Sequence, residues 1–469
     1  MNIQRARTQP RTASTPGLQA TRRVMWTLAQ PWFDSTALWA MSRWYLPLSR
    51  AWAAASVAEG SVERFQRELP VERINPAARF GLSRALHRTA ALQRLLNSAE
   101  ADWEEVFFSP HLPEQRALFS AERRRREASH AFMFARSGFG LLRLGADYPC
   151  VRYEIPSPQT TAVALRKCLD NPAAAYLPPD PLPKVEVSHR LEHPNFSEYW
   201  LRFPSLDAKD GKSAWAHVRE PKGVVDPPSL VHVHGLGVEF ESLDGIEDDV
   251  DPVVGMGVRL VRVEALWHNR RRLPGQYGGE PFLSRQPVAG IELMLAVARE
   301  MAVLVSWCRS TSRGPVAIGG TSMGALSTQL VACRAHDWPK AMIPDALWLV
   351  TTSDDLGGLA FNSSLAKAVH LPRELTKAGW SRDGLSILSS LVEIDRPPVM
   401  APEDVVVVLG RRDDVTPYSR GAAMVAGWNV PQQNVFHREL GHFSVPLGLL
   451  GDQGPLMRLV ARLRTGSRR

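Results

Sequence analysis

Short apolar runs that alternate with helical stretches constrain the fold of this chain more than any other feature of its sequence. The runs lie at 230–234, 258–266, 315–319, 346–351, 405–409 and 435–440. The helical stretches include 288–307, 323–336 and 452–464. Because these runs are rich in apolar, β-branched residues, they indicate strands buried on both faces. We therefore predict an α/β fold for residues 185–469, with helices on both faces of a mostly parallel sheet.

Three regions follow from the pattern along the chain. Residues 1–147 have helical periodicity and five tryptophans among the first 52, which predicts a helical N-terminal region. That region either packs on the core, which a hydrophobic helix stripe favours, or lies on a membrane surface. Residues 148–184 are predicted to be a proline-rich connector, stiff and extended where five prolines fall within 171–184. In the third region, 185–469, the long segment 355–403 between two strands is a candidate lid.

Charge and cysteine content narrow the environment and the partners. The net charge of +8 favours anionic partners such as an acidic membrane surface. No nucleic-acid motif accompanies the basic run 123–126, which predicts a solvated helix face, so we expect no nucleic acid. The four cysteines lack CxxC spacing, which indicates neither zinc nor a redox pair. We expect a cytoplasmic protein without cofactor, and leave peripheral association with an anionic membrane open.

The clearest chemical motif is Gly320-Thr321-Ser322-Met323-Gly324, a G-x-S-x-G sequence. A short apolar strand precedes it and a helical stretch follows it. This order is typical of a nucleophile elbow, in which glycines permit close backbone contacts and the serine hydroxyl points outward. The pattern predicts Ser322 as a nucleophile.

A serine nucleophile requires a base and an acid that orients it. His442 follows the last strand, in Gly441-His442-Phe443, and is the best candidate for the base. Asp413 follows the strand at 405–409, in a turn closed by Pro417, and is the predicted acid. Asp414 is the second choice, and Asp354 or Asp355 after the preceding strand are minor alternatives.

Two further sets of residues are candidates for binding. The backbone N–H of Met323 and that of Leu236, with Gly237 as the second choice, are predicted to receive the oxyanion. His232 and His234 have no acidic cluster nearby, so no metal is predicted. The three arginines at 270–272 follow a strand, at the sheet edge where ligands bind. They are tentative substrate-binding residues (Arg270, Arg271 and Arg272), and the alternative is that they pair with acidic residues.

Several stretches carry a resemblance to a known family: His234–Gly237, Val263–Gln276, Gly320–Gly324, Trp338–Pro344 and Phe33–Trp52. Over roughly residues 185–465 the sequence resembles the alpha/beta-hydrolase superfamily. It is most similar to the family of the alpha/beta-hydrolase domain-containing protein 18. The resemblance implies an alpha/beta-hydrolase fold and an acyl-ester hydrolase, with lipid as one candidate substrate class.

Together these features predict a serine hydrolase that cleaves a carboxylic ester, on a small molecule or a lipid, through a Ser322-His442-Asp413 triad and an acyl-enzyme intermediate. An acyltransferase would use the same triad, with an alcohol or a thiol in place of water. A non-catalytic scaffold at a membrane surface would keep the fold without a reactive serine. The sequence does not distinguish these alternatives.

Overall fold

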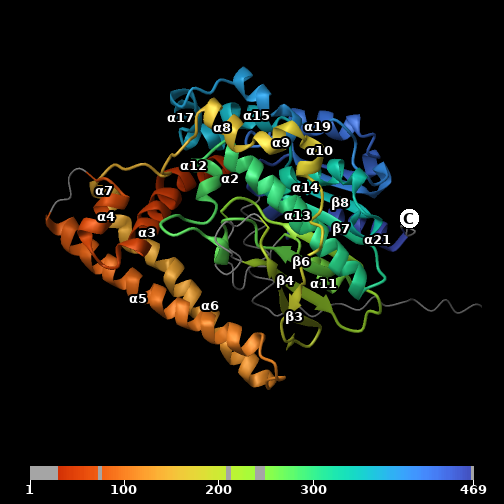
Figure 1. Ribbon diagram of the computed structural model, residues 1–469, viewed down its shortest axis with the longest axis horizontal. Helices are drawn as coiled ribbons and strands as arrows, with labels where there is room; N and C mark the ends of the chain where they lie inside the picture. The colour runs from red at the N-terminus through yellow and green to blue at the C-terminus, as the bar shows by residue number, and fades with distance from the viewer. Residues whose placement is uncertain (1–29, 72–75, 207–212, 238–248, 466–469) are drawn as a thin grey trace, which may run out of the picture.

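The computed structural model describes residues 30–71, 76–206, 213–237 and 249–465 (Figure 1). Its centre is a ten-stranded sheet. The strands are β1 (Glu186–Val187), β2 (Leu191–Glu192), β3 (Phe196–Pro204), β4 (Ser213–Pro221), β5 (Ser229–Val233), β6 (Arg259–Val263), β7 (Val316–Thr321), β8 (Ala346–Val350), β9 (Val405–Gly410) and β10 (Val435–Arg438).

The sheet has a parallel part and a smaller antiparallel part. The strand order is β1-β3-β4-β6-β5-β7-β8-β9-β10, and β2 pairs with β3 off this path. From β6 to β10 all neighbours are parallel, whereas β1 to β4 pair antiparallel, as β4 does with β6. A mostly parallel sheet with an antiparallel edge and a strand–turn–helix unit at β7 confirms the predicted alpha/beta-hydrolase class.

Both faces of the parallel strands are buried, because alternate residues enter two different cores. In β9, Val405, Val407 and Leu409 belong to the larger core, with the helices α13 and α14. Val406 and Val408 belong to the second core, with α11, α20 and α21. This explains why strands such as β9 (VVVVLG) have no charged residue on either face.

Helices surround the sheet, and several short ones form a cap over one end of it (Figure 1). Those on and beside the sheet are α11 (Pro252–Gly255), α12 (Glu280–Ser284), α13 (Val288–Thr311), α14 (Met323–Arg334), α19 (Tyr418–Gly427), α20 (Ser444–Leu449) and α21 (Gly454–Thr465). Those of the cap are α15 (Leu356–Asn362), α16 (Ser364–Ala368), α17 (Leu371–Lys377) and α18 (Ser389–Val392).

The N-terminal region is helical and shares the main core. Its helices are α2 (Pro31–Ala40), α3 (Leu46–Ala58), α4 (Val62–Glu68), α5 (Pro76–Phe107), α6 (Gln115–Phe134) and α7 (Gly140–Gly145). Helices α5 and α6 form a long hairpin whose tip lies beside β3, and its opposite end lies away from the sheet (Figure 1). The Trp52 ring of α3 is fully buried and its Nε1 donates to the Phe132 carbonyl at 2.9 Å. Near the tip of the hairpin, Trp103 and Phe107 pack against Trp200 and Trp215 of β3 and β4.

Within the connector, residues 177–184 form neither helix nor strand. The preceding part contains three short helices that were not predicted: α8 (Pro158–Ala164), α9 (Arg166–Asp170) and α10 (Pro172–Ala175). Tertiary hydrogen bonds fix them, since Tyr176 donates its hydroxyl to Leu391 and accepts from Trp338 through its carbonyl. Pro158 and Pro172 stand in the first turn of α8 and α10, where proline is tolerated, and four further prolines of the connector follow α10.

The antiparallel part of the sheet was not predicted in detail. Residues 186–192 form two short strands, β1 and β2, separated by 188–190, and β4 was not predicted. Strand β4 holds the charged residues Arg219 and Glu220, which interrupt a simple apolar alternation. Glu198 and Tyr199 of the neighbouring strand β3 bind Arg219 and Glu220, respectively. Sequence patterns do not show such contacts between strands.

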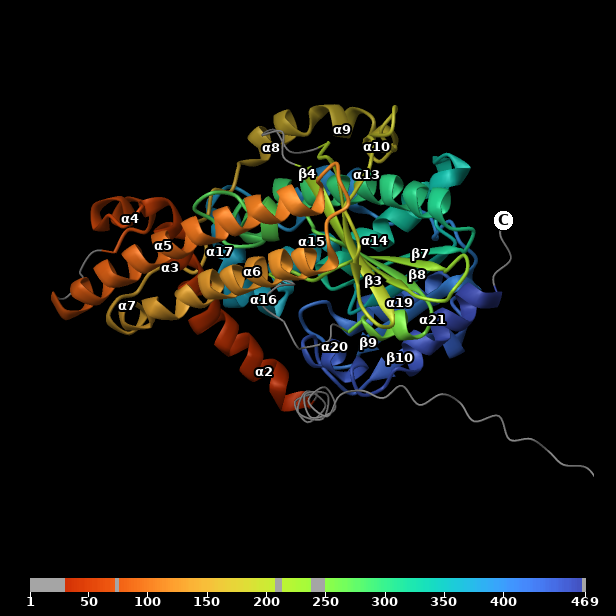
Figure 2. The same ribbon diagram turned by 90° about the horizontal axis from the view of Figure 1, so that it is seen from below.

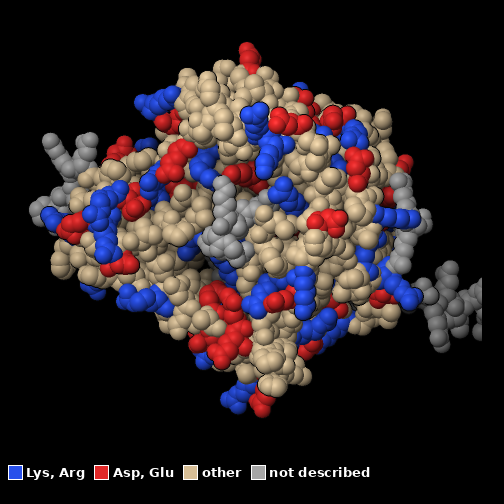
Figure 3. Space-filling view, in the orientation of Figure 1, with Lys and Arg blue, Asp and Glu red and all other residues tan. Residues whose placement is uncertain are grey.

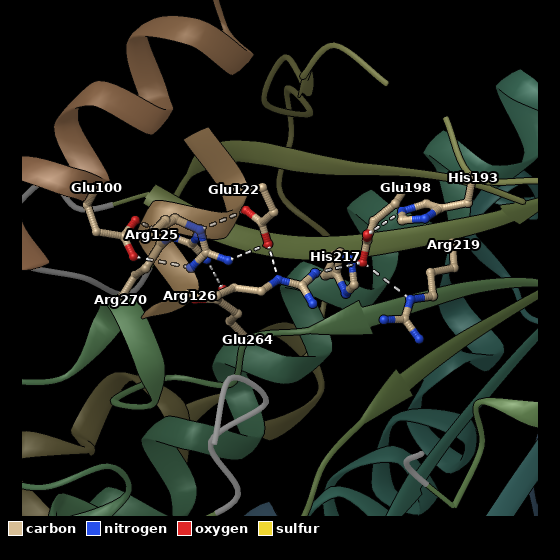
Figure 4. Close-up of polar contacts among 10 residues, drawn as sticks. All are labelled: Glu100, Glu122, Arg125, Arg126, His193, Glu198, His217, Arg219, Glu264 and Arg270. Carbon is tan, nitrogen blue, oxygen red and sulfur yellow. Dashed lines mark hydrogen bonds and ion pairs between the residues drawn. The ribbon is translucent and has the colours of Figure 1, made fainter. Parts of the chain in front are cut away.

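The basic run at 123–126 is not simply a solvated face. Arg125 is only 2% exposed, and it forms a fork with both oxygens of Glu122 at 2.9 Å. Arg126 reaches Glu198 of β3 at 3.2 Å (Figure 4). These arginines join the α5–α6 hairpin to the sheet. On the face drawn in Figure 3, basic and acidic side chains are mixed instead of forming one basic field.

Candidate active site

Ser322 stands on a strained turn between β7 and α14. Its φ of 57° and ψ of −119° lie in a region that residues other than glycine rarely adopt. The turn is tight: a Cβ at Gly324 would collide with the Val233 carbonyl, and one at Gly320 with the backbone of Gly324. The Ser322 N–H donates to the Val350 carbonyl at 2.9 Å, which fixes the turn to β8.

The structure brings Ser322, His442 and Asp413 into one hydrogen-bonded row. Ser322 Oγ lies 2.8 Å from His442 Nε2, and His442 Nδ1 lies 2.9 Å from Asp413 Oδ2. They reach the same edge because β7, β9 and β10 are parallel and each side chain follows the carboxyl end of its strand. The Asp413 carboxylate accepts from the N–H groups of Val415 and Thr416 at 2.9 and 2.8 Å, so it is held as an acceptor for Nδ1–H.

The other carboxylates considered as the acid that orients His442 have different partners. Asp414 is exposed and accepts from the Ser364 hydroxyl at 2.8 Å. Asp354 pairs with Arg420, and Asp355 caps α15 through the Gly358 N–H. Asp413 is therefore the carboxylate, among those considered, that the fold directs to His442.

For the oxyanion donor from the turn at 234–237, the structure favours the Leu236 N–H over the Gly237 N–H. Gly237 N–H already donates to His268 Nε2 at 3.3 Å. His268 is buried, and burial together with the neighbouring His234 holds the pKa of His268 well below its usual range, so the ring stays neutral and can accept. Leu236 and Met323 both line the pocket beside Ser322. Met323 is the first residue of α14, where the N–H has no partner within the helix.

Two buried histidines that the sequence analysis left without a function shape this turn. His234 Nε2 accepts the Ala265 N–H at 3.3 Å, and its Nδ1 faces the Gly235 carbonyl at 2.7 Å. Gly279, with a φ of 77°, lies against His268, where a Cβ would come within 2.5 Å of Nε2. The only sequence signal for them was their place beside the two strand ends.

The tentative substrate arginines are not directed to the pocket, which corrects that expectation. Arg271 is buried and binds both oxygens of Glu300 at 2.7 and 2.9 Å. Arg270 pairs with Glu100 and Glu264, and the Arg272 guanidinium lies over the Trp52 ring at 4.5 Å. None of the three is among the residues that line the pocket. Arg270 and Arg271 pair with acidic residues of the chain, which was the alternative prediction, whereas the Arg272 contact with an aromatic ring was not predicted.

A pocket of about 990 Å³, including its opening to solvent, begins at Ser322. Helix α13 provides Ile291 and Met294, and the cap segment 355–403 provides most of the opposite wall, including Leu359, Ala366 and Leu388. The described lining residues are apolar apart from a few uncharged polar groups, and none carries a formal charge. Such a wall accepts an acyl chain and disfavours a charged group.

The comparison with known families supports the class that the topology indicates. Residues 253–354 match the family described as alpha/beta hydrolase domain containing 18. This segment includes β6, β7 with the Ser322 turn, and β8. The match confirms the predicted resemblance over that part of the chain. No curated protein matches the sequence as a relative.

Several solved structures share part of the architecture at low identity. Acetyl xylan esterase 1 from Thermoanaerobacterium is 16% identical, with a TM-score of 0.41, and the alignment covers 67% of this chain and 97% of that one. Carboxyl esterase 2 from Tuber melanosporum is 14% identical, with a TM-score of 0.38, covering 59% and 89%. The acylaminoacyl peptidase of Pyrococcus horikoshii is 14% identical, with a TM-score of 0.40, covering 59% and 42%.

One prediction left open whether the N-terminal region lies on a membrane surface. Among the described residues, the helices are all too short or too polar to cross a bilayer. Residues 1–29 of that region lie outside the described residues.

Proposed function

We propose that the protein is a serine hydrolase of carboxylic esters, with Ser322 as nucleophile, His442 as general base and Asp413 as the acid that orients it. The row of hydrogen bonds from Ser322 Oγ through the imidazole to Asp413 carries the proposal. His442 takes the hydroxyl proton as Ser322 attacks the ester carbonyl, and then returns it to the leaving alcohol. Water activated by His442 then attacks the acyl-enzyme, releases the acid and regenerates Ser322.

The oxyanion of each tetrahedral intermediate is assigned to the N–H groups of Met323 and Leu236. The engagement of the Gly237 N–H by His268 supports Leu236 as the second donor. A donor of this kind typically contributes about 3–4 kcal/mol to the transition state, because it is already oriented where charge develops.

The substrate is proposed to carry an uncharged, apolar acyl group. The uncharged walls from α13 and the cap support this choice, since they would desolvate a charged acid without pairing it. Simple fatty acyl esters and lipid esters both fit this description, and the cap is proposed as a lid over the acyl chain.

The proposal is tested by fluorophosphonate labelling and by hydrolysis of p-nitrophenyl esters of graded chain length. Labelling at Ser322 should be lost in Ser322→Ala and strongly reduced in His442→Ala, with turnover lower by at least about 10⁴-fold. Arg309→Gln, far from the triad at the surface pair with Asp345, serves as the matched control and should behave as wild type. A folded wild type that neither labels nor hydrolyses any ester contradicts the proposal and favours a scaffold. Faster acyl transfer to an added alcohol or thiol than to water favours an acyltransferase.

A further inference from the structure

A carboxylate from the N-terminal region reaches the turn that carries His442. Asp34 of α2 accepts the Phe443 N–H at 2.6 Å and the Ser444 N–H at 3.2 Å with one oxygen. Its other oxygen accepts from the Ser444 hydroxyl. The two residues after His442 are therefore bound to a side chain more than 400 positions earlier in the chain.

The residue before His442 is shaped for the same carboxylate. A Cβ on Gly441 would come within 2.5 Å of the Asp34 carboxyl carbon, and its three nearest neighbours are all atoms of that carboxyl group. The Gly441 N–H also donates to Ser444 Oγ at 3.0 Å, so the Ser444 hydroxyl links Gly441 to Asp34. Asp34 thus lies against both flanks of His442.

The His442 turn has two anchors of different kinds. On its N-terminal side the sheet holds it, because the Leu440 carbonyl accepts the Arg412 N–H at 3.1 Å, beside the end of β9. On its C-terminal side α20 begins at Ser444, and its N-cap, Phe443, supplies no side-chain cap. Asp34 satisfies the first N–H groups of that helix instead.

Helix α2 itself has few other attachments. It contains no fully buried residue, and Trp32 and Trp39 are 56% and 58% exposed. It lies across the end of the cap, in contact with α16 and α20 (Figure 2). The Asp34 bonds are consequently a large part of what joins α2 to the C-terminal part of the chain.

We propose that Asp34 is a positioning residue for the reaction, which holds the Gly441–Ser444 turn so that His442 stays in register with Ser322 and Asp413. It touches no reacting atom and acts through the turn. The inference rests on the proposed function of the triad. Small displacements of a catalytic group carry a large cost: about 1 Å can lower a rate by about 10²-fold.

The first experiment compares Asp34→Ala and Asp34→Asn with wild type. We expect Asp34→Ala to lower kcat and the fluorophosphonate labelling rate by about 10- to 100-fold, with KM for a short ester nearly unchanged. Asp34→Asn should fall in between, because its amide oxygen still accepts a backbone N–H. Asp452→Asn is the matched control, since Asp452 accepts the Gly454 N–H at 2.9 Å outside the pocket. Its kinetics should be those of wild type.

The second experiment uses the contact with Gly441. Gly441→Ala should impair wild type as Asp34→Ala does, because the new methyl group displaces the carboxylate. In the Asp34→Ala background it should add little, since its φ is not in the left-handed region and the space is then open. Full additivity of the two losses would overturn the proposal, and so would wild-type kinetics in Asp34→Ala.

Hydrogen exchange separates this inference from the proposed function. Asp34→Ala should speed amide exchange in peptides that cover 441–446. The unfolding temperature of this variant should stay close to that of Asp452→Asn, so the faster exchange reports a local change. If wild-type Ser322 proves unreactive, the proposed function fails, whereas faster exchange still supports Asp34 as the anchor of the turn. Unchanged exchange overturns that anchor whatever the activity.

Discussion

The pocket beside Ser322 and the contact between the α5–α6 hairpin and the sheet differ in their content of charged residues. The described walls of the pocket carry no formal charge, although the chain has 104 acidic and basic residues, 56 of them Lys or Arg and 48 Asp or Glu. The hairpin contact instead contains a continuous row of ionic groups. It runs from Glu264 through Arg270, Glu100, Arg125, Glu122 and Arg126 to Glu198 (Figure 4).

The difference shows that a buried ionised group requires charged or hydrogen-bonding neighbours that stabilise it. Glu198 is 1% exposed but is surrounded by His193, His217, Arg219 and Arg126. Burial opposes its ionised form, yet the charge and hydrogen bonds of His217, His193 and Arg219 keep the pKa of Glu198 well below the usual range. The pocket offers no such partners, so a charged ligand group there would stay unpaired.

The largest expected effect falls on the pocket side, at the orienting acid. Asp413→Asn should lower kcat by about 10⁴-fold, because the amide can hold the wrong imidazole tautomer. Asp414→Asn, next in sequence but exposed, should retain wild-type kcat. Steady-state kinetics on a short ester measures both. Equal losses would contradict the assignment of Asp413.

On the hairpin side, Glu198→Ala should lower the free energy of unfolding by about 1–3 kcal/mol, because it leaves the partly buried Arg126 and Arg219 without this acceptor. Glu104→Ala is the matched variant on the same hairpin. It removes a carboxylate that is 42% exposed and pairs with Arg202 of β3. It should cost less than about 1 kcal/mol. Urea denaturation followed by fluorescence compares the two variants. If they are equally stable, the buried row does not join the hairpin to the sheet.

A more moderate effect tests the acyl pocket. Ala366→Phe fills space in the α16 wall and should shift preference from long to short acyl esters by about 10- to 100-fold. Lys367→Phe places the same ring at an exposed neighbouring position of α16 and should leave the preference unchanged. The ratio of kcat/KM for octanoate and acetate esters is the measurement. An unchanged ratio in Ala366→Phe would show that acyl chains do not occupy this wall.

The smallest expected effect is on the pH dependence of stability. Burial lowers the pKa of His217 to about 4 in spite of Glu198, so the unfolded chain takes up this proton first as pH falls. Stability is then lost between about pH 6.5 and 4, and the depressed pKa of Glu198 adds loss below about pH 4.3. His217→Gln should flatten the upper part of this decline in thermal unfolding scans. The same slope in wild type and variant would contradict the assignment to His217.

Local signals in the sequence predicted the strands of the parallel part and the three triad residues. Ser322, Asp413 and His442 each follow a strand, and the fold brings them together because parallel strands end at one edge. Their catalytic roles remain predictions. Residues whose position depends on distant parts of the chain could not be predicted in this way. Asp34 is set against Gly441, Arg125 against Trp103 and Trp200, and Arg271 against Glu300. No spacing rule connects such pairs.

The burial of α3 also bears on how the chain acquires its fold during synthesis. Arg50 donates to the Gly275 carbonyl and to Glu280, which are 225 and 230 residues further along. At a translation rate of about 5–20 residues per second, α3 leaves the ribosome about 10 to 50 seconds before these partners exist. During this interval the apolar residues of α3 and Arg50 lack their native contacts. A chaperone that binds apolar segments of nascent chains could shield this helix during that interval.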